Sequence, residues 1–533
     1  MADIDASAGA GAGEGTRVAG DPGNGSRLVP PDAPPAYHRL LERLGQVSDL
    51  RATASLLHWD EEVNMPPGGA AARAEQKATL SRLAHQAFTA PEVGEWLDEL
   101  APWAAQLDPE SDAAALLRVT RREYDRSRRV PPDLVAELAR ASSQGYQAWV
   151  EARAQRRFAP FAPALARLIE LRRQMADALG YAEERYDALL EEHEPGMRTR
   201  QVRELFARLK AGLLPLVQAI AERQDRVRDD FLRGDFPEAD QWALTLEALR
   251  AIGFDFRRGR QDRSIHPFTA GLSPGDVRLT TRVDPTVFGP ALFSSLHEGG
   301  HGLYEQGLPT AWQRTPLADG ASSAVHESQS RLWENVIGRS REFWIFFFPK
   351  VQARFPHQLA GVDAEAMYRA VNRSRPSLIR VDADEVTYNL HIMLRFELEL
   401  ALLDGDLPVD ELPAAWREKT RAYLGLEPAD DGEGVLQDIH WSWGGFGYFP
   451  SYALGNLIAL QLWEAALRDE PALPEQIARG DLGGVLRWMR AHVHRHGARY
   501  EPLELVRRAT GSELGEDAFL RYVRRKYGEL YGL

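Results

Sequence analysis

Apolar residues recur at three- and four-residue spacing over most of the chain, which is the spacing of a buried helix face. The first such run begins at Tyr37 and continues through Leu40 and Leu44. Amphipathic segments rich in Ala, Leu, Glu and Arg follow from 70 to about 228, separated by prolines. These patterns predict a mainly helical protein with many amphipathic helices.

One stretch departs from this pattern after a helix expected over 241–252. Val277, Leu279, Thr281 and Val283 alternate with polar positions, which predicts a strand of a small sheet. We expect an edge strand that lines a cleft and binds an extended peptide. Helices are expected again from Pro290 to the end of the chain.

The first 33 residues differ from the rest in composition. They are rich in Gly, Ala, Pro and Asp without periodicity, so we expect a disordered tail over 1–33. Residues 34–533 are expected to form a single domain. Its N-terminal helical part would cover about 34–235, and the part that holds the candidate site about 236–533.

Charge and composition exclude several classes of function. The net charge of −14 argues against a general nucleic-acid partner or an anionic membrane surface. The absence of cysteine excludes disulfides and thiolate metal sites. No apolar run reaches about 18 residues, so no membrane span is expected. Without a basic and apolar leader at the N-terminus, we expect a cytoplasmic protein.

The candidate chemistry centres on His297, Glu298 and His301, which follow the order HExxH. On a helix the two histidines lie one turn apart and can both face one metal ion. Glu298 then lies beside the ion without binding it. In this arrangement zinc lowers the pKa of a water molecule and the carboxylate removes its proton.

Two glycines, Gly299 and Gly300, lie inside this predicted helix. Each costs a helix interior roughly 1 kcal/mol relative to alanine. We therefore expect another chain to pass close to the backbone here, and a peptide substrate is our interpretation.

A zinc ion held by two histidines lacks a third protein ligand. A second helix that begins near Ser322 or Ser323 offers Glu327 and His326, of which we favour Glu327 because a His2Glu set is typical of peptide-hydrolysing zinc enzymes. A rival metal site is offered by His492, His494 and His496, which are two residues apart in the sequence. A helix would point these three imidazoles in different directions, which argues against a shared metal ion.

Six short blocks extend the comparison beyond the HExxH pattern. They are HPFT (266–269), DVRLT (276–280), HEGGH (297–301), HESQS (326–330), IRVDAD (379–384) and GVLQDIHW (434–441). In this order the blocks resemble the carboxypeptidase Taq family of zinc metallocarboxypeptidases, which are of the HExxH type. Looser matches before and after them extend the resemblance over nearly everything beyond the tail.

The resemblance implies a large multi-helix, saddle-like body with a deep active-site groove and a small β-sheet beside it. It places the zinc ligands on His297, His301 and Glu327 and the catalytic glutamate on Glu298. It also implies one Zn²⁺ per chain, replaceable by Co²⁺, and a homodimer. The expected substrates are peptides with a free C-terminus, shortened one residue at a time with broad specificity.

The remaining blocks suggest substrate contacts. A carboxypeptidase must recognise a terminal carboxylate, for which Arg380 is the first candidate and Arg278 the second. Gln437 and His266 are further candidates for the groove. A hydrogen-bond donor aimed at the developing oxyanion would supplement the zinc, and His440 or Tyr448 is expected in that role.

Two alternatives remain open from the residues alone. One is a zinc oligopeptidase that cuts internal bonds of short peptides, which would tolerate an amidated C-terminus. The other is a catalytically inert, metal-stabilised scaffold that binds peptides, which the presence of Glu298 argues against.

Overall fold

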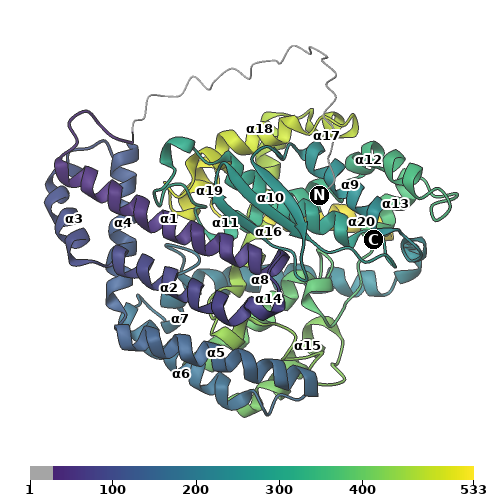
Figure 1. Cartoon of the computed structure of the whole chain (residues 1–533). Coiled ribbons are helices and arrows are strands. Elements are labelled where there is room, and N and C mark those ends of the chain that lie inside the picture. The colour runs from purple at the N-terminus through teal and green to yellow at the C-terminus, as the bar shows by residue number, and fades with distance from the viewer. Residues whose placement is uncertain (1–27) are drawn as a thin grey trace, which may run out of the picture.

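The computed structural model describes residues 28–533 and is mainly helical with one small sheet, as the sequence pattern predicted (Figure 1). Most of the tail predicted over 1–33 lies outside the described residues. At the start of the described part, the hydroxyl of Tyr37 donates a hydrogen bond of 2.6 Å to the carbonyl oxygen of Leu28. This contact attaches residue 28 to the first helix.

Between residues 28 and 221 the chain forms eight α-helices. They are α1 (Pro35–Val63), α2 (Ala70–Phe88), α3 (Pro91–Ala104), α4 (Asp112–Arg129), α5 (Pro132–Gln155), α6 (Ala162–Leu179), α7 (Arg185–Leu190) and α8 (Thr199–Ala221). Figure 1 shows α1 and α2 side by side along one flank of the molecule. Apolar residues of α1 to α4 form a cluster of their own, which Trp312 and Leu317 join from the other half.

The C-terminal half carries the remaining α-helices and a π-helical segment called η5. They are α9 (Glu238–Ile252), α10 (Pro290–Gly307), α11 (Ser323–Arg331), η5 (Leu332–Ile337), α12 (Arg341–Arg354), α13 (Ala364–Val371), α14 (Tyr388–Asp404), α15 (Leu412–Leu424), α16 (Phe449–Asp469), α17 (Leu473–Ala478), α18 (Gly483–His492), α19 (Pro502–Thr510) and α20 (Asp517–Tyr531). A larger apolar cluster draws on both halves of the chain, with α16 buried along most of its length.

The sheet corrects one prediction. Its strands are β1 (Gly259–Arg263), β2 (Thr269–Ser273) and β3 (Asp276–Thr281), in the order β1-β3-β2. The strand predicted at 277–283 is β3, which pairs with β1 in parallel and with β2 antiparallel. The prediction of an edge strand was therefore wrong, because both sides of β3 are already occupied. Only the strands that flank β3 have an unpaired side within this sheet.

Three helices cross at the HExxH segment, and glycines allow their close approach. A Cβ atom added at Gly300 of α10 would lie 2.4 Å from the carbonyl oxygen of Gln329 and 2.6 Å from Cα of Ser330, both on α11. A Cβ atom at Gly455 of α16 would lie 2.7 Å from Cβ of Glu327. The helix α11 is thus held between α10 and α16 at distances that only glycine permits.

The same distances correct the interpretation of Gly299 and Gly300. Both residues are buried, and a Cβ atom at Gly299 would lie 2.6 Å from Leu249 and 2.9 Å from Ile252 of α9. The object that passes close to the helix backbone is therefore the protein itself rather than a peptide substrate. Gly300 is required for the contact with the α11 backbone, whereas Gly299 faces the ends of two side chains of α9.

The most apolar block of the sequence, 343–349, lies in α12. Phe343, Trp344 and Phe347 are fully buried there. Among residues 28–533, no helix combines the length and apolar character needed to cross a membrane.

The glycine contacts predict different effects for two neighbouring substitutions. Gly300→Ala forces the α11 backbone away, and overpacking of this kind costs roughly 1 to 3 kcal/mol or more. Gly299→Ala meets only the ends of flexible side chains, and it gains up to about 1 kcal/mol of helix propensity. Urea unfolding should show a large loss of stability for Gly300→Ala and a small change for Gly299→Ala. Equal losses would contradict this account of the crossing.

Candidate metal centre

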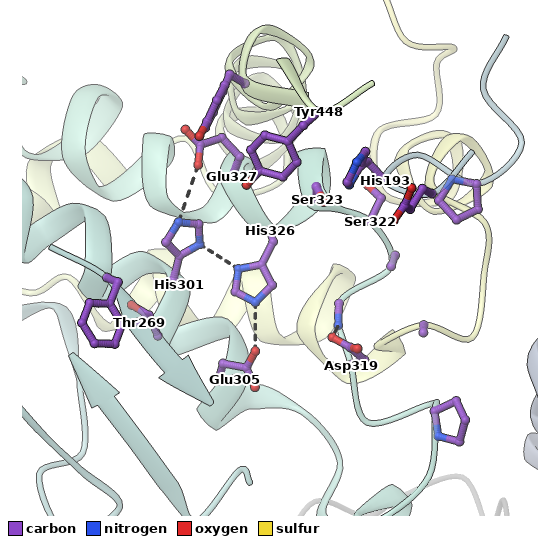
Figure 2. A pocket seen from close by; sticks show the side chains of 18 of the residues that line it. His193, Thr269, His301, Glu305, Asp319, Ser322, Ser323, His326, Glu327 and Tyr448 are labelled. Carbon is purple, nitrogen blue, oxygen red and sulfur yellow. Dashed lines mark hydrogen bonds and ion pairs between the residues drawn. The ribbon is translucent and has the colours of Figure 1, made fainter. Parts of the chain in front are cut away.

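A cavity of about 800 Å³ opens beside α10 and α11 (Figure 2). Its floor carries the HExxH residues and Glu327, and the segment that leads into β2 lies along one wall. Helices α1 and α4 contribute Arg51 and Arg126 from the N-terminal half. The cavity therefore lies where the two halves of the chain meet.

Three side chains at the floor have the geometry of a metal site. The Nε2 atoms of His297 and His301 lie 3.7 and 3.5 Å from Oε2 of Glu327. One ligand atom from each residue lies within 4.8 Å of the others. Tetrahedral zinc with bonds of about 2.0 to 2.2 Å separates its ligand atoms by roughly 3.3 to 3.6 Å. The donor set therefore fits a zinc-sized ion.

Both histidines are oriented through their other ring nitrogen. His297 Nδ1 lies 2.8 Å from Oε2 of Glu334, and His301 Nδ1 lies 2.7 Å from Nδ1 of His326. Figure 2 shows His301 between Glu327 and His326, and Glu305 on the far side of His326 at 2.9 Å. Partners of this kind fix the tautomer and direction of a metal-binding imidazole. His326 therefore supports His301, and the geometry favours Glu327 as third ligand.

A buried arginine compensates the carboxylates at this centre. Arg331 Nε lies 2.7 Å from Oε1 of Glu327, and its Nη1 lies 3.2 Å from Oε2 of Glu334. Burial opposes ionisation of Glu327, but the charge of Arg331 and the imidazoles outweigh it and hold the pKa of Glu327 well below its usual range. Burial lowers the pKa of His301 to about 3, so its imidazole is neutral at pH 7. Glu327 and His301 are thus in the protonation states that a metal requires.

Glu298 lies at the same floor but belongs to no ligand set. Its Oε2 accepts a hydrogen bond of 2.6 Å from the hydroxyl of Thr269, the first residue of β2. Burial raises the pKa of Glu298. The strand β2 therefore orients the carboxylate that the HExxH pattern predicted to act on water.

The start of α11 is anchored by the segment after α7. The Oε1 atom of Glu194 accepts hydrogen bonds from the Ala324 amide at 2.6 Å and the Ser451 hydroxyl at 2.7 Å. The Ser323 amide donates to the carbonyl oxygen of His193 at 3.1 Å. Because α11 carries Glu327, these contacts help to position the third donor.

The two predicted carboxylate anchors do not line this cavity, but the Arg380 guanidinium lies 5.0 Å from the ring centre of Tyr452, which does. Arg380 is buried in an ion pair, with Nη2 at 2.8 Å from Asp438 and Nη1 donating to the hydroxyl of Tyr388 at 3.0 Å. Arg278 forms a double contact with Asp276 at 3.0 Å. Neither residue lines the cavity that holds the metal donors. Each would have to exchange an existing carboxylate partner for a substrate.

The other predicted site residues divide into two groups. Tyr448 lines the cavity. His440 does not, but its Nε2 lies 3.2 Å from the hydroxyl of Tyr452, which does. The side chain of Gln437 forms hydrogen bonds within the protein, which include one from the Arg380 amide. His266 is exposed beside the rim of the cavity.

The rival histidine cluster does not form among the described residues. His494 is buried with Nε2 at 2.9 Å from Gln329, and His492 stacks on Trp488. The one group of three His or carboxylate ligands found within 28–533 is His297, His301 and Glu327.

Several important residues were not assigned a role from the sequence. Glu334 was detectable, because it follows Glu327 by two helical turns and therefore shares its face. Thr269 and Glu194 reach the site through tertiary contacts alone. Tyr452 follows Tyr448 by four residues, and that spacing was a usable signal.

Two imidazoles and a carboxylate around one point, with a further carboxylate beside them in a cavity, define a metal-dependent hydrolase. The family model described as "Carboxypeptidase Taq (M32) metallopeptidase" matches residues 39–527. The chain is 44% identical to thermostable carboxypeptidase 1 of Thermus thermophilus over 507 residues, covering 93% of this chain and 99% of that protein.

Carboxypeptidase 1 of Bacillus subtilis is 38% identical, and the match covers 93% of this chain and 98% of that protein. The crystal structure of the M32 carboxypeptidase from Deinococcus radiodurans aligns with a TM-score of 0.91 at 42% identity, over 93% of this chain and 100% of that one. The chain belongs to the carboxypeptidase Taq family. It is a metallocarboxypeptidase, a peptide hydrolase, and the oligopeptidase alternative is not favoured.

The contacts of Glu334 predict a role in metal affinity. Glu334→Gln keeps the shape of the side chain but removes the charge that holds His297 and Arg331. Loss of such a partner typically weakens metal binding about 10- to 100-fold. Competition with a chromophoric chelator should show this loss, and activity should recover in part at saturating metal. Unchanged affinity would contradict the assignment.

Glu194 predicts a pH dependence of stability. Burial raises its pKa to about 7, so the folded state holds this proton more tightly than the unfolded chain. Glu194 thus lowers stability as pH rises from about 4.5 to 7. Glu194→Gln retains the acceptor oxygen but cannot ionise. It therefore removes the pH-dependent loss in the free energy of unfolding, which is on the order of 3 kcal/mol at most. Urea midpoints should therefore favour the variant more at pH 8 than at pH 5, whereas a pH-independent difference would refute the prediction.

Proposed function

We propose that this carboxypeptidase uses one Zn²⁺ per chain, replaceable by Co²⁺, held by His297, His301 and Glu327. The observation that carries the proposal is the approach of the three donors to distances typical of tetrahedral zinc. Each of the three donors is held by a partner at an atom other than its metal-facing one, and the Ser330 hydroxyl also donates to the metal-facing Oε2 of Glu327 at 3.2 Å. A bound zinc ion supplies a Lewis acid that activates water and polarises the scissile carbonyl group.

Glu298 is proposed as the general base. Its carboxylate accepts a proton from the attacking water, whose oxygen bonds to the carbonyl carbon. When the C–N bond breaks, Glu298 delivers that proton to the leaving nitrogen. The products are the shortened peptide with a new carboxylate and a free amino acid. Thr269 keeps Glu298 oriented during both transfers.

Tyr448 is proposed to donate a hydrogen bond to the developing oxyanion. It lines the cavity, and burial raises its pKa to about 12, so the phenol retains its proton at neutral pH. His440 acts behind Tyr452 rather than in the cavity itself. Tyr452 is therefore the second donor that the geometry supports.

The natural substrates are proposed to be peptides with a free C-terminus, cleaved with broad specificity. The size of the cavity supports access for varied side chains. The homodimer implied by the family resemblance stays a prediction, and so do the cytoplasmic location expected from the sequence and the exclusion of nucleic-acid and membrane partners by charge.

One experiment tests metal dependence, reaction class and the general base together. Mass spectrometry of an unblocked peptide should show a ladder that shortens from the C-terminus, abolished by a chelator and restored by Zn²⁺ or Co²⁺. Glu298→Gln should retain about one metal per chain while losing roughly 100- to 10,000-fold in rate. It thus differs from Glu334→Gln, whose rate recovers with added metal.

Three results would refute parts of this proposal. Turnover in metal-free protein would remove the metal from the mechanism. Internal fragments without a ladder would restore the oligopeptidase alternative. Loss of the metal in Glu298→Gln would reassign Glu298 as a ligand or a support of the site.

A further inference from the structure

A buried carboxyl group outside the metal cavity has no role in the proposed mechanism. Glu399 of α14 is fully buried and does not line the cavity. Its Oε1 atom accepts a hydrogen bond of 2.8 Å from Nε1 of Trp441. Its Oε2 atom accepts hydrogen bonds from the Tyr186 hydroxyl at 2.7 Å and from the Gly447 amide at 3.1 Å. One side chain therefore joins α14 to α7 and to the loop that leads into α16.

Two of these three contacts lie in the segment from Trp441 to Tyr448, which we call the 441–448 loop. Gly447 directly precedes Tyr448, the cavity residue at the start of α16. Gly447 has a φ of +88°, and a Cβ atom there would lie 2.6 Å from the carbonyl carbon of Leu189 in α7. One residue before Tyr448, the loop therefore packs against α7 at a distance that only glycine permits.

A second buried carboxyl group holds the chain after Tyr448. Glu194 accepts a hydrogen bond of 2.7 Å from the hydroxyl of Ser451, which follows Tyr448 by three residues. The ring of His193 lies 4.9 Å from the Tyr448 ring, and Figure 2 shows both side chains on the same side of the cavity as Glu327. Tyr448 thus lies between two buried carboxyl groups, each bonded to the chain within three residues of it.

The contacts of Glu399 require an acceptor at both of its oxygens. The Trp441 indole and the Gly447 amide can only donate, and they bond to different oxygens of the carboxyl group. Burial raises the pKa of Glu399 to about 7, but in either protonation state each oxygen can accept a hydrogen bond. The amide nitrogen of a glutamine cannot accept one. Glutamine at this position would therefore lose one of the two contacts with the loop.

The position of the Tyr448 hydroxyl is sensitive to the backbone that carries it. This hydroxyl is the side-chain atom farthest from the backbone, so a small rotation at the start of α16 displaces it by a larger distance. A group that stabilises an oxyanion must be held within about 0.5 Å of its productive position. The contacts before and after Tyr448 supply such a constraint.

We propose that Glu399 is a positioning residue, which fixes the 441–448 loop through Trp441 and Gly447 and thereby holds the Tyr448 hydroxyl where the oxyanion develops. This inference rests on the proposed role of Tyr448 and deepens it. Glu399 contacts none of the three metal donors and lies outside the cavity, so its effect on the rate passes through Tyr448.

The first test is Glu399→Gln, assayed on an unblocked tripeptide at saturating Zn²⁺. The value of kcat should fall about 10- to 100-fold, because a displaced donor loses part of the stabilisation of the oxyanion, while KM and metal content stay unchanged. In the Tyr448→Phe background the same substitution should change kcat less than about twofold, because no donor hydroxyl remains to be displaced. A purely structural defect would lower kcat equally in both backgrounds.

A second variant perturbs the same carboxyl group more gently. Tyr186→Phe removes one hydroxyl and keeps the ring, which packs edge-on against Phe396. Because Glu399 then loses the contact that orients it from α7, kcat should fall about 2- to 10-fold, and again only when the Tyr448 hydroxyl is present. This variant decides the question if Glu399→Gln does not yield folded protein.

Glu397→Gln is the matched control. Glu397 lies two residues earlier on α14 and accepts hydrogen bonds from Lys210 at 2.9 Å and from Tyr423 at 2.6 Å, neither of which lines the cavity. This carboxylate also joins helices, but it has no contact with the 441–448 loop. Glu397→Gln should lower the thermal midpoint and leave kcat within about twofold of the original enzyme.

Four outcomes would overturn the inference. Two concern kcat alone: an equal loss with and without the Tyr448 hydroxyl, and an unchanged value in both Glu399→Gln and Tyr186→Phe. The others are a loss of bound metal in Glu399→Gln and a loss of kcat in Glu397→Gln as large as in Glu399→Gln.

Failure of the proposed function gives a different pattern. Absence of a C-terminal ladder with the intact enzyme rejects the proposed cleavage, and an undiminished kcat in Tyr448→Phe rejects Tyr448 as the donor. A slow Tyr448→Phe enzyme, together with an additive loss from Glu399→Gln, rejects the role of Glu399 alone.

Discussion

At Gly300 the backbones of α10 and α11 approach so closely that no side chain fits between them. This crossing decides the position of Glu327, because the two histidines lie on α10 and the third donor lies on α11. On the other side of α11, Gly455 allows α16 to approach the base of the Glu327 side chain. A metal site needs its donors within a few tenths of an ångström, and a helix clamped on both faces supplies that accuracy.

The crossing brings together charged groups that a protein interior would otherwise exclude. Glu327, Arg331 and Glu334 lie within about two turns of the same segment with side chains at most 15% exposed, and Arg331 contacts both carboxylates. Each ion would be unfavourable alone in this environment, and the desolvation is offset only when all members are present. The charge balance therefore couples the orientation of His297 to the state of Glu327. The π-helical turn that carries Glu334 is a common feature of such functional segments.

The N-terminal helices contribute the opposite wall of the cavity, and their contribution is mainly electrostatic. The donor side presents carboxylates and imidazoles, whereas α1 and α4 present the arginines. These helices also have an apolar cluster of their own, which Trp312, Leu317 and Ala318 join from the other half. The N-terminal half also contributes Glu123, Glu191 and Glu192 to the cavity, so this wall carries both charges.

Local patterns in the sequence were enough to predict most of the helices, the three side chains that the fold gathers as a possible metal site, and the family. His297 and His301 are four residues apart and therefore lie on the same face of α10, a relation that can be derived from the sequence alone. The periodicity of apolar residues likewise predicted α9 to α12. The six ordered blocks carried the family assignment without any structure. These features depend on neighbours in the chain, and a sequence displays such neighbours directly.

Contacts between distant segments were decided only by the tertiary structure. Whether Arg380 faces a substrate or Asp438, whether β3 lies at an edge, and whether Gly299 and Gly300 face a peptide or other helices all depend on residues far apart in sequence. The sequence next to a glycine or an arginine is the same whether that residue contacts a substrate or another part of the protein. The partner that satisfies it is chosen by packing and by the cost of leaving a buried charge alone.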